Sequence, residues 1–313
     1  MILPYFGKLP NYFSLFLLSC KNNPEIDWLL YTDSQVQSPA SNIKINHCSF
    51  DIFVERIRKS IPFPITLTSP YDLCDFKPTY GEVLKDDIVG YDFWGHCDCD
   101  LIFGDIRHFV TEDILEHYHK VFVLGHFVLY HNDKETNGFY RRQHFLDARI
   151  ALNDAHQYYF DEWPGVGQAW QQQGLAFYNR ACFDDIYIRR YEFWPTNRLP
   201  GCRNYQPRFK SMKHIIYSYH DNALYRIWEQ QGQMCKEEIL YIHLQKRKME
   251  METAPTEQFL IVPNKFIPFD DTLTVRKLKS LSPFWSLNRI CINLRRDIKH
   301  ILYLIKVRIL PKK

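Results

Sequence analysis

Two carboxylates, Asp98 and Asp100, give this sequence its clearest chemical signal. They follow the apolar run 91–94, which predicts a β-strand, and residues two apart at a strand end share one face. Paired carboxylates on one face suit a hard divalent cation, Mn²⁺ or Mg²⁺, that keeps open positions for phosphate oxygens. Such a cation would neutralise the charge on a departing nucleoside diphosphate. A solvated acidic turn is the alternative interpretation.

Two basic segments could extend such a site. His243 lies three residues before Lys246, so a turn or short helix can present both on one side. The imidazole would be a further ligand for Mn²⁺, and the ammonium would hold the diphosphate. Lys77, shortly before the acidic pair, could contact the donor sugar or its phosphate. The alternatives are a surface His beside the basic run 246–248 and a solvated Lys77.

A second acidic pair, Asp161 and Glu162, precedes Trp163. One carboxylate of the pair could take the proton from an acceptor hydroxyl as a general base, and the indole could stack on a sugar. We also expect His126 to contact the acceptor. The alternative for the pair is an acidic turn or helix cap.

The elements that would position these groups alternate between strand and helix in the N-terminal half. Strands are predicted at residues 2–3, 27–32, 43–47, 91–94 and 121–124, and helices at 11–21 and 49–60. This alternation predicts a parallel-rich sheet covered on both faces, with ligands beyond the carboxyl ends of its strands. From residue 130 to 275 we expect loops and short helices that shape a second substrate pocket, with a polar linker at 249–256.

Four motifs occur along the chain in a specific order. They are Pro-Tyr-Phe-Gly at 4–7, Trp-Leu-Leu-Tyr-Thr-Asp at 28–33, Phe-Lys-Pro at 76–78 and Trp-Gly-His-Cys-Asp-Cys-Asp-Leu-Ile-Phe-Gly-Asp at 94–105. In this order, over roughly residues 2–250, they resemble a family of bacterial capsular and lipopolysaccharide glycosyltransferases. The resemblance implies a GT-A-like α/β/α sandwich with a Rossmann-like nucleotide-binding sheet. Its nucleotide-sugar half would span about 1–125, its acceptor half about 126–275, and a basic extension 276–313.

The resemblance also implies roles for individual residues. Asp98 and Asp100 would form the metal motif, with Asp100 the more direct ligand and Asp98 also facing the donor. A uridine diphosphate sugar is the expected donor. The residues that would border its nucleoside are Pro4, Tyr5, Phe6 and Asp33.

The stereochemical outcome stays open at this point. His243 and Lys246 are similar to the pair that closes over the diphosphate in retaining GT-A enzymes, although the usual Gly between them is absent. An acidic pair such as Asp161 and Glu162 is instead typical of inverting GT-A enzymes.

Composition agrees with a globular protein of one large or two small domains. Of the 313 residues, 46% are hydrophobic and 24% charged, which excludes a disordered chain. Nine cysteines, an odd number without a Cys-x-x-Cys pair, and no basic leader region predict a reduced, cytoplasmic protein.

Residues 276–313 carry a strong positive charge, with 11 Lys or Arg and one Asp, a net of +10. Apolar residues recur at a spacing of three to four over 286–310, which predicts a basic amphipathic helix. Such a helix suits the surface of an anionic membrane, and we expect peripheral contact with the inner face of the cell membrane beside a lipid-linked glycan acceptor. A helix packed on the body is the alternative. Sparse aromatic residues argue against single-stranded nucleic acid as a partner.

These patterns together favour a metal-dependent glycosyltransferase that moves a sugar from a nucleotide-sugar to a surface glycan. A metal-dependent phosphohydrolase could use the same acidic pair, but it would need further clustered ligands that the sequence does not offer. A non-catalytic scaffold of a glycan-assembly machine is the third hypothesis, and the retention of both Asp98 and Asp100 argues against it.

Overall fold

The computed structural model of the protein describes residues 1–142, 146–188, 190–196, 211–254, 256–283, 290–291, 293–295, 297–299 and 301–302. These residues form two compact units that interleave along the chain. Unit 1 contains residues 1–99 and 106–181, and unit 2 contains 100–105, 182–196 and the described residues from 211 onward. The predicted boundaries near 125 and 275 do not coincide with this division, because the chain crosses between the units more than once.

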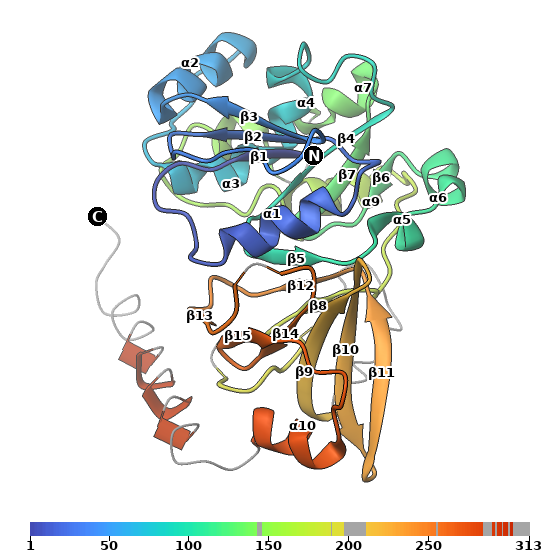
Figure 1. Cartoon of the computed structure of the whole chain (residues 1–313). Helices are drawn as coiled ribbons and strands as arrows, with labels where there is room; N and C mark the ends of the chain where they lie inside the picture. Colours follow the sequence, from blue (N-terminus) through green and yellow to red (C-terminus); the bar gives the residue numbers. More distant parts are fainter. Residues whose placement is uncertain are drawn as a thin grey trace. The chain divides into compact units, whose positions relative to one another are not determined.

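Unit 1 is built on a six-stranded, mostly parallel sheet (Figure 1). Its strands, in spatial order, are β3 (Ile43–His47), β2 (Trp28–Thr32), β1 (Ile2–Pro4), β4 (Phe93–Cys97), β7 (Phe127–His131) and β6 (Lys120–Val121). The first four are parallel, and β7 runs antiparallel to both β4 and β6. The predicted parallel-rich sheet is confirmed. The strand predicted at 91–94 begins two residues later, and the one predicted at 121–124 is the two-residue β6.

Helices cover both faces of this sheet (Figure 1). The two helices predicted in the N-terminal half are confirmed as α1 (Phe13–Lys21) and α2 (Phe50–Ser60). The ring of Phe16 in α1 meets Trp28, whereas Phe53 in α2 meets Tyr31. Positions 28 and 31 of one strand point to opposite faces, so the two helices lie on opposite sides.

The remaining helices of unit 1 are short, and several of them pack in the core that covers the sheet. They are η1 (Pro70–Asp72), α3 (Leu73–Phe76), η2 (Lys77–Thr79), α4 (Tyr80–Val83), α5 (Ile106–Phe109), α6 (Glu112–His117), α7 (Lys134–Asn137), η3 (Phe139–Arg141), α8 (Ala148–Ala151), the π-turn η4 (Trp163–Gly167) and α9 (Gln168–Gln172).

Unit 2 is dominated by β-structure. One six-stranded sheet has the order β11 (Gln233–Ile239), β10 (Ala223–Gln230), β9 (Lys213–His220), β14 (Phe259–Val262), β15 (Lys265–Pro268) and β13 (Glu250–Met251). A three-stranded sheet has the order β5 (Leu101–Phe103), β12 (Tyr241–His243) and β8 (Asp184–Asp185). The prediction of loops and short helices is therefore wrong for residues 213–268, and β13 falls inside the predicted linker.

Two tight turns explain why this region forms hairpins. Asp221 and Asn222 both have positive φ between β9 and β10, as do Gln231 and Gly232 between β10 and β11. Two-residue turns with positive φ match the right-handed twist of paired strands. Such turns could have been predicted from Asp-Asn and Gln-Gly between β-rich runs.

Helix α10 (Val275–Leu281) completes unit 2 and buries Leu278 among Ile216, Ile227 and Leu260. Residues 276–281 thus belong to a packed helix rather than to a basic extension. Beyond it, the described residues between 290 and 302 are helical, whereas 286–289 and 303–310 of the predicted helix lie outside the described residues. Among the described cysteines, Cys20, Cys48, Cys235 and Cys291 are free thiols. No helix among the described residues has the length and apolar character needed to cross a bilayer.

Candidate functional site

The strand order of unit 1 reverses between β1 and β4, and this reversal marks the expected ligand-binding edge. Strands β1 and β4 are parallel neighbours, so their carboxyl ends meet at the same edge of the sheet. Asp98 directly follows β4, and its N–H donates to the His126 carbonyl at 3.0 Å. Open α/β sheets bind ligands at such a topological switch point.

A buried ammonium organises the acidic residues at this edge. Lys77 donates to Asp98 Oδ1 at 2.8 Å and to the Gly125 carbonyl at 2.9 Å, and it lies 3.2 Å from Asp161 Oδ2. Burial opposes the charged ammonium, but Asp98 and Asp161 outweigh it and raise the pKa of Lys77. These three partners match the three donors of an ammonium. The structure therefore brings together three residues that sequence analysis identified separately.

The folding of the preceding turn explains this convergence. Lys77 begins η2, directly after α3, and Asp75 in α3 accepts from the backbone N–H groups of Tyr158 at 2.8 Å and Phe160 at 2.7 Å. These bonds tie the Lys77 turn to the segment that ends in Asp161. Asp75 is a positioning residue that sequence reasoning did not identify.

Asp161 is a buried carboxyl group whose affinity for a proton is raised. It is only 3% exposed, and burial raises its pKa to about 7. The nearby Lys77 ammonium lowers this pKa, but it offsets the effect of burial only in part. A side chain at Gly125 would place its Cβ 2.1 Å from Asp161 Oδ2, so this close approach requires glycine. The neighbouring Glu162 and Trp163 are half-buried, and the Trp163 ring lies 6.3 Å from that of Phe177.

The residues expected to border a nucleoside lie at the ends of β1 and β2. Asp33 accepts from the N–H of Gly7 at 2.9 Å and so fixes the loop after β1, while the N–H of Tyr5 donates to the Tyr31 carbonyl. Pro4 is the last residue of β1. The ring of Phe6, by contrast, is buried against Phe50 and Phe53, which leaves only its backbone for a ligand.

Unit 2 holds a second polar group around His243. In the three-stranded sheet, His243 pairs with Leu101 on one side and with Asp185 on the other. Its Nδ1 lies 2.9 Å from Asp185 Oδ1, and its Nε2 lies 3.3 Å from Asp100 Oδ1. Burial lowers the pKa of His243, but Asp100 and Asp185 outweigh this effect and raise it to about 10. Burial also opposes the charged form of Asp100, whose pKa is nevertheless lowered to about 2, chiefly by His243.

The segment after His243 is a turn and not a short helix. Gln245 and Lys246 both have positive φ, and the Lys246 backbone N–H donates to Asp100 Oδ2 at 2.5 Å. The Lys246 side chain is exposed. Asp185, missed by sequence reasoning, also accepts from Gln245 Nε2. The adjacent acidic residues at 184–185 were the signal that could have drawn attention to it.

The Asp-x-Asp motif is shared between the two units. The chain leaves unit 1 after Cys99 and enters unit 2 at Asp100. Asp98 consequently belongs with Lys77 and Asp161, whereas Asp100 belongs with His243.

The fold defines an α/β protein whose unit 1 has a topological switch point between β1 and β4, the place where open α/β sheets bind ligands. The chain belongs to a family of unknown function, DUF6625, whose model matches residues 1–270. A comparison with proteins of curated function found no match. Among solved structures, the chain is similar to the galactosyltransferase LgtC in complex with donor and acceptor sugar analogues, with 12% identity and a TM-score of 0.34. That similarity covers 59% of this chain and 76% of LgtC.

Proposed function

We propose that this protein is a metal-dependent glycosyltransferase that moves a sugar from a nucleotide-sugar donor to a glycan acceptor in bacterial capsule or lipopolysaccharide synthesis. The geometry of His243 carries the proposal. Its Nδ1 is held by Asp185, so its Nε2 is directed at Asp100. A carboxylate behind the imidazole is the usual way in which proteins orient a histidine that binds metal.

The residues in unit 2 fit a divalent cation, which on binding would displace a proton from His243 to solvent. Two adjacent ligand atoms, each bonded to one ion at about 2.1 Å, lie roughly 3.0 Å apart in octahedral geometry and roughly 3.4 Å apart in tetrahedral geometry. The 3.3 Å between His243 Nε2 and Asp100 Oδ1 falls in this range. An imidazole together with a carboxylate suits Mn²⁺. Asp98 is the other carboxylate of the Asp-x-Asp motif and remains a candidate ligand.

Each group of residues has a distinct part in the proposed transfer. A bound cation would neutralise charge on the departing diphosphate. Lys246 would hold the diphosphate, and Pro4, Tyr5, the Phe6 backbone and Asp33 would border the nucleoside. Asp161 would take the proton of the acceptor hydroxyl, with Glu162 as the other candidate base, while Trp163 and His126 would contact the acceptor. Lys77 would hold Asp98 and Asp161 in place, because its donors are already directed at protein oxygens.

Nucleotide binding tests this proposal most directly. Calorimetry with UDP, GDP and CDP in the presence of Mn²⁺ should show the tightest binding for UDP, and a chelator should weaken it strongly. Tighter binding of GDP or CDP would overturn the uridine donor. Failure of all three nucleotides to bind would overturn the glycosyltransferase. Release of phosphate from nucleotide-sugars without any acceptor would instead indicate a phosphohydrolase.

The helix near the C-terminus supports a membrane-associated acceptor within this proposal. Described apolar side chains on one side of it remain 47–59% exposed: Ile290, Leu294, Ile298, Ile301 and Leu302. Within unit 2, Asn293 accepts from the Tyr191 N–H at 2.5 Å, so the helix has a polar contact while its apolar stripe stays open. An apolar stripe flanked by Lys and Arg suits the headgroup region of an anionic membrane.

Removing this helix should therefore separate membrane binding from catalysis. Truncation after Pro283, which keeps α10, should weaken binding to anionic vesicles in a sedimentation assay, since each basic residue near such a surface contributes about 1 kcal/mol. Transfer to a soluble acceptor should remain. A matched variant with Ile290, Leu294 and Ile298 changed to Ser keeps the charge and should also bind vesicles less well. Unchanged sedimentation of the truncated protein would refute the membrane contact.

A further inference from the structure

A cluster of two histidines and an aspartate lies at one end of the β6–β7 pair in unit 1. His119 directly precedes β6, His131 ends β7, and Asp133 is the N-cap residue of α7. The N–H of His131 donates to the His119 carbonyl at 2.8 Å, so the two histidines face each other across the antiparallel pair. Directly opposite residues of such a pair project to the same face.

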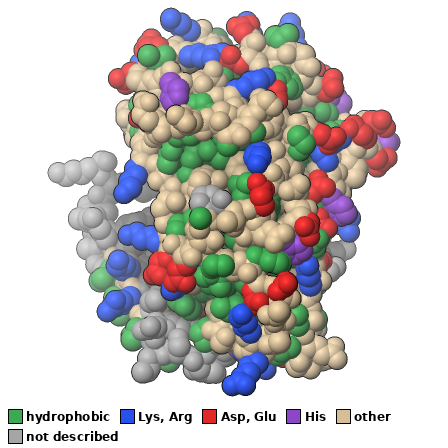
Figure 2. All heavy atoms as spheres, in the orientation of Figure 1, with side chains coloured by type: hydrophobic (Ala, Val, Ile, Leu, Met, Phe, Trp, Pro, Cys, Tyr) green, Lys and Arg blue, Asp and Glu red, His purple; other side chains and the backbone are tan. Residues whose placement is uncertain are grey.

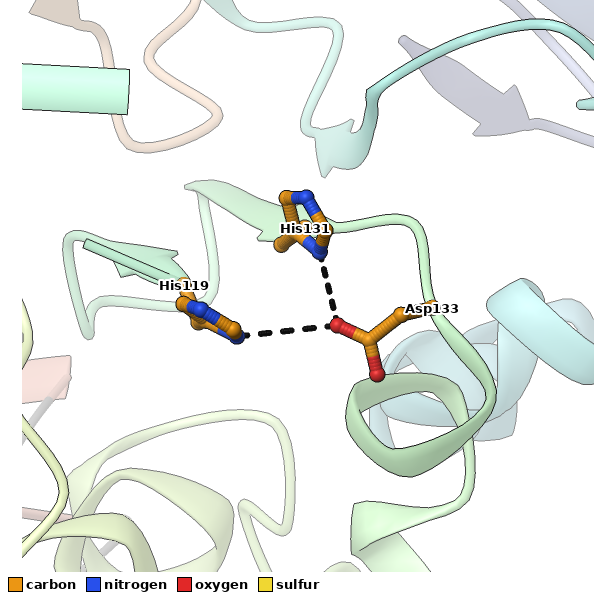
Figure 3. A group of neighbouring side chains, drawn as sticks. All are labelled: His119, His131 and Asp133. Atoms are coloured by element: carbon orange, nitrogen blue, oxygen red, sulfur yellow. Dashed lines mark hydrogen bonds and ion pairs between the residues drawn. The ribbon is translucent and has the colours of Figure 1, made fainter. Parts of the chain in front are cut away.

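Both imidazoles are directed at the same carboxylate oxygen (Figure 3). Asp133 Oδ2 lies 2.7 Å from His131 Nδ1 and 3.5 Å from His119 Nδ1. The ring centroids of the two histidines are 4.8 Å apart. Three potential ligand atoms from three different positions therefore lie within 4.8 Å of one another.

We propose that His119, His131 and Asp133 form a binding site for a transition-metal cation of the Zn²⁺ type. Tetrahedral zinc with bonds of about 2.0–2.2 Å places its ligand atoms roughly 3.4 Å apart. The distance between His119 Nδ1 and Asp133 Oδ2, 3.5 Å, is already close to this value. His131 would exchange its hydrogen bond to Asp133 for the metal by moving less than about 1 Å. Three protein ligands leave the fourth position open to water or a small anion.

The surroundings hold the carboxylate in place for this role. Asp133 Oδ1 accepts from the backbone N–H of Thr136 at 2.8 Å, and Oδ2 accepts from the Thr136 hydroxyl at 2.9 Å. The cap thus fixes the Asp133 rotamer before any cation arrives. His119 is mostly exposed, which gives a cation access from solvent.

Nearby negative charge favours cation binding at this place. Acidic side chains gather over α6 (Figure 2), where Glu112, Asp113 and Glu116 are exposed in the segment that leads to His119. His119 also lines a pocket with Trp170 and with Glu135, whose charge is balanced by its ion pair with Arg142. The excess of acidic side chains over α6 raises the local concentration of cations.

This site is chemically distinct from the proposed catalytic one. Two imidazoles favour Zn²⁺, Co²⁺ or Ni²⁺, whereas Mg²⁺ selects oxygen ligands. None of its three ligands takes part in the proposed transfer. The inference therefore stands whether or not the protein is a glycosyltransferase.

Titration of chelator-treated full-length protein with Co²⁺, followed by its visible absorption, tests the site. We expect the intense bands of tetrahedral Co²⁺, displaced by Zn²⁺ and not by Mg²⁺. His119→Ala should weaken Co²⁺ binding by at least about 10–100-fold, the loss typical even of residues that only support a ligand. Asp133→Asn should also weaken it while keeping the cap of α7, since asparagine caps helices well.

Matched variants decide which group of residues binds the cation. His156→Ala removes an exposed histidine of unit 1 and should leave the Co²⁺ spectrum unchanged. His243→Ala should leave the tetrahedral bands in place. Equal Co²⁺ binding by His119→Ala and the unaltered protein, or loss of the bands in His243→Ala alone, would overturn the site. Because His119 is exposed, an unchanged melting temperature of His119→Ala should verify that the variant is folded.

Discussion

Asp100→Asn should reduce glycosyl transfer by about 10²–10³-fold, the loss typical of removing one group that stabilises charge in a transition state. The substitution keeps an oxygen that can accept from the Lys246 N–H, so the turn after β12 is preserved. It removes the negative charge that faces His243 Nε2, and with it one of the proposed metal ligands. Turnover of a UDP-sugar at saturating Mn²⁺ measures the effect.

Two further measurements separate lost metal binding from lost folding. Electron paramagnetic resonance of Mn²⁺ should show weaker binding to Asp100→Asn, and the melting temperature should show that the protein still folds. Asp105→Asn, an exposed aspartate at the end of the same short segment, is the matched control and should keep full activity. Full turnover of Asp100→Asn, or full activity in the presence of a chelator, would remove the metal from the mechanism.

Asp161→Asn should lower the rate by about 10²–10⁴-fold, the contribution of a general base. The pH profile gives the sharper test, because the pKa of Asp161 is raised to about 7. A base must be deprotonated to accept a proton, so the rate should rise with pH up to about 7 and level off above it. Below that value, protonated Asp161 should cost about tenfold per pH unit.

The variant at the neighbouring position decides between the two candidate bases. Glu162→Gln should keep both the rate and its decrease below about pH 7, whereas Asp161→Asn should no longer show that decrease. The reverse result would assign the base to Glu162. If neither substitution changes turnover, the acidic pair is not the base, and the configuration of the product should then be compared with that of the donor to test for retention.

Local sequence patterns were sufficient for the first three strands and the two long helices of unit 1, but they missed β7. The period of Phe53, Val54 and Ile57 predicted α2, because a 3.6-residue repeat needs only one apolar surface to pack against. The apolar run at 28–32 likewise predicted β2. The sheet of unit 2 was missed, although its two hairpin turns carried a readable signal, because its strands show no regular alternation: β10 is buried or half-buried throughout, whereas most of β11 is exposed or half-buried.

The limit of what local sequence patterns can predict is clearer still for the candidate site residues. By itself, the sequence determined the chemical types present: an acidic pair after a strand, a histidine before a lysine, and a second acidic pair beside a tryptophan. Residue types and short spacings are local properties, so they can be read without a fold. Asp98, Asp161 and His243 were all identified in this way.

Only the tertiary structure decided which of these groups meet. Lys77 reaches Asp161 because the Asp75 carboxylate binds the backbone at Tyr158 and Phe160. Asp185 reaches His243 because β8 pairs with β12. These contacts depend on hydrogen bonds between segments far apart in the chain, and no local spacing encodes them. The protonation behaviour of Asp161 follows from burial, which likewise exists only once the chain has folded.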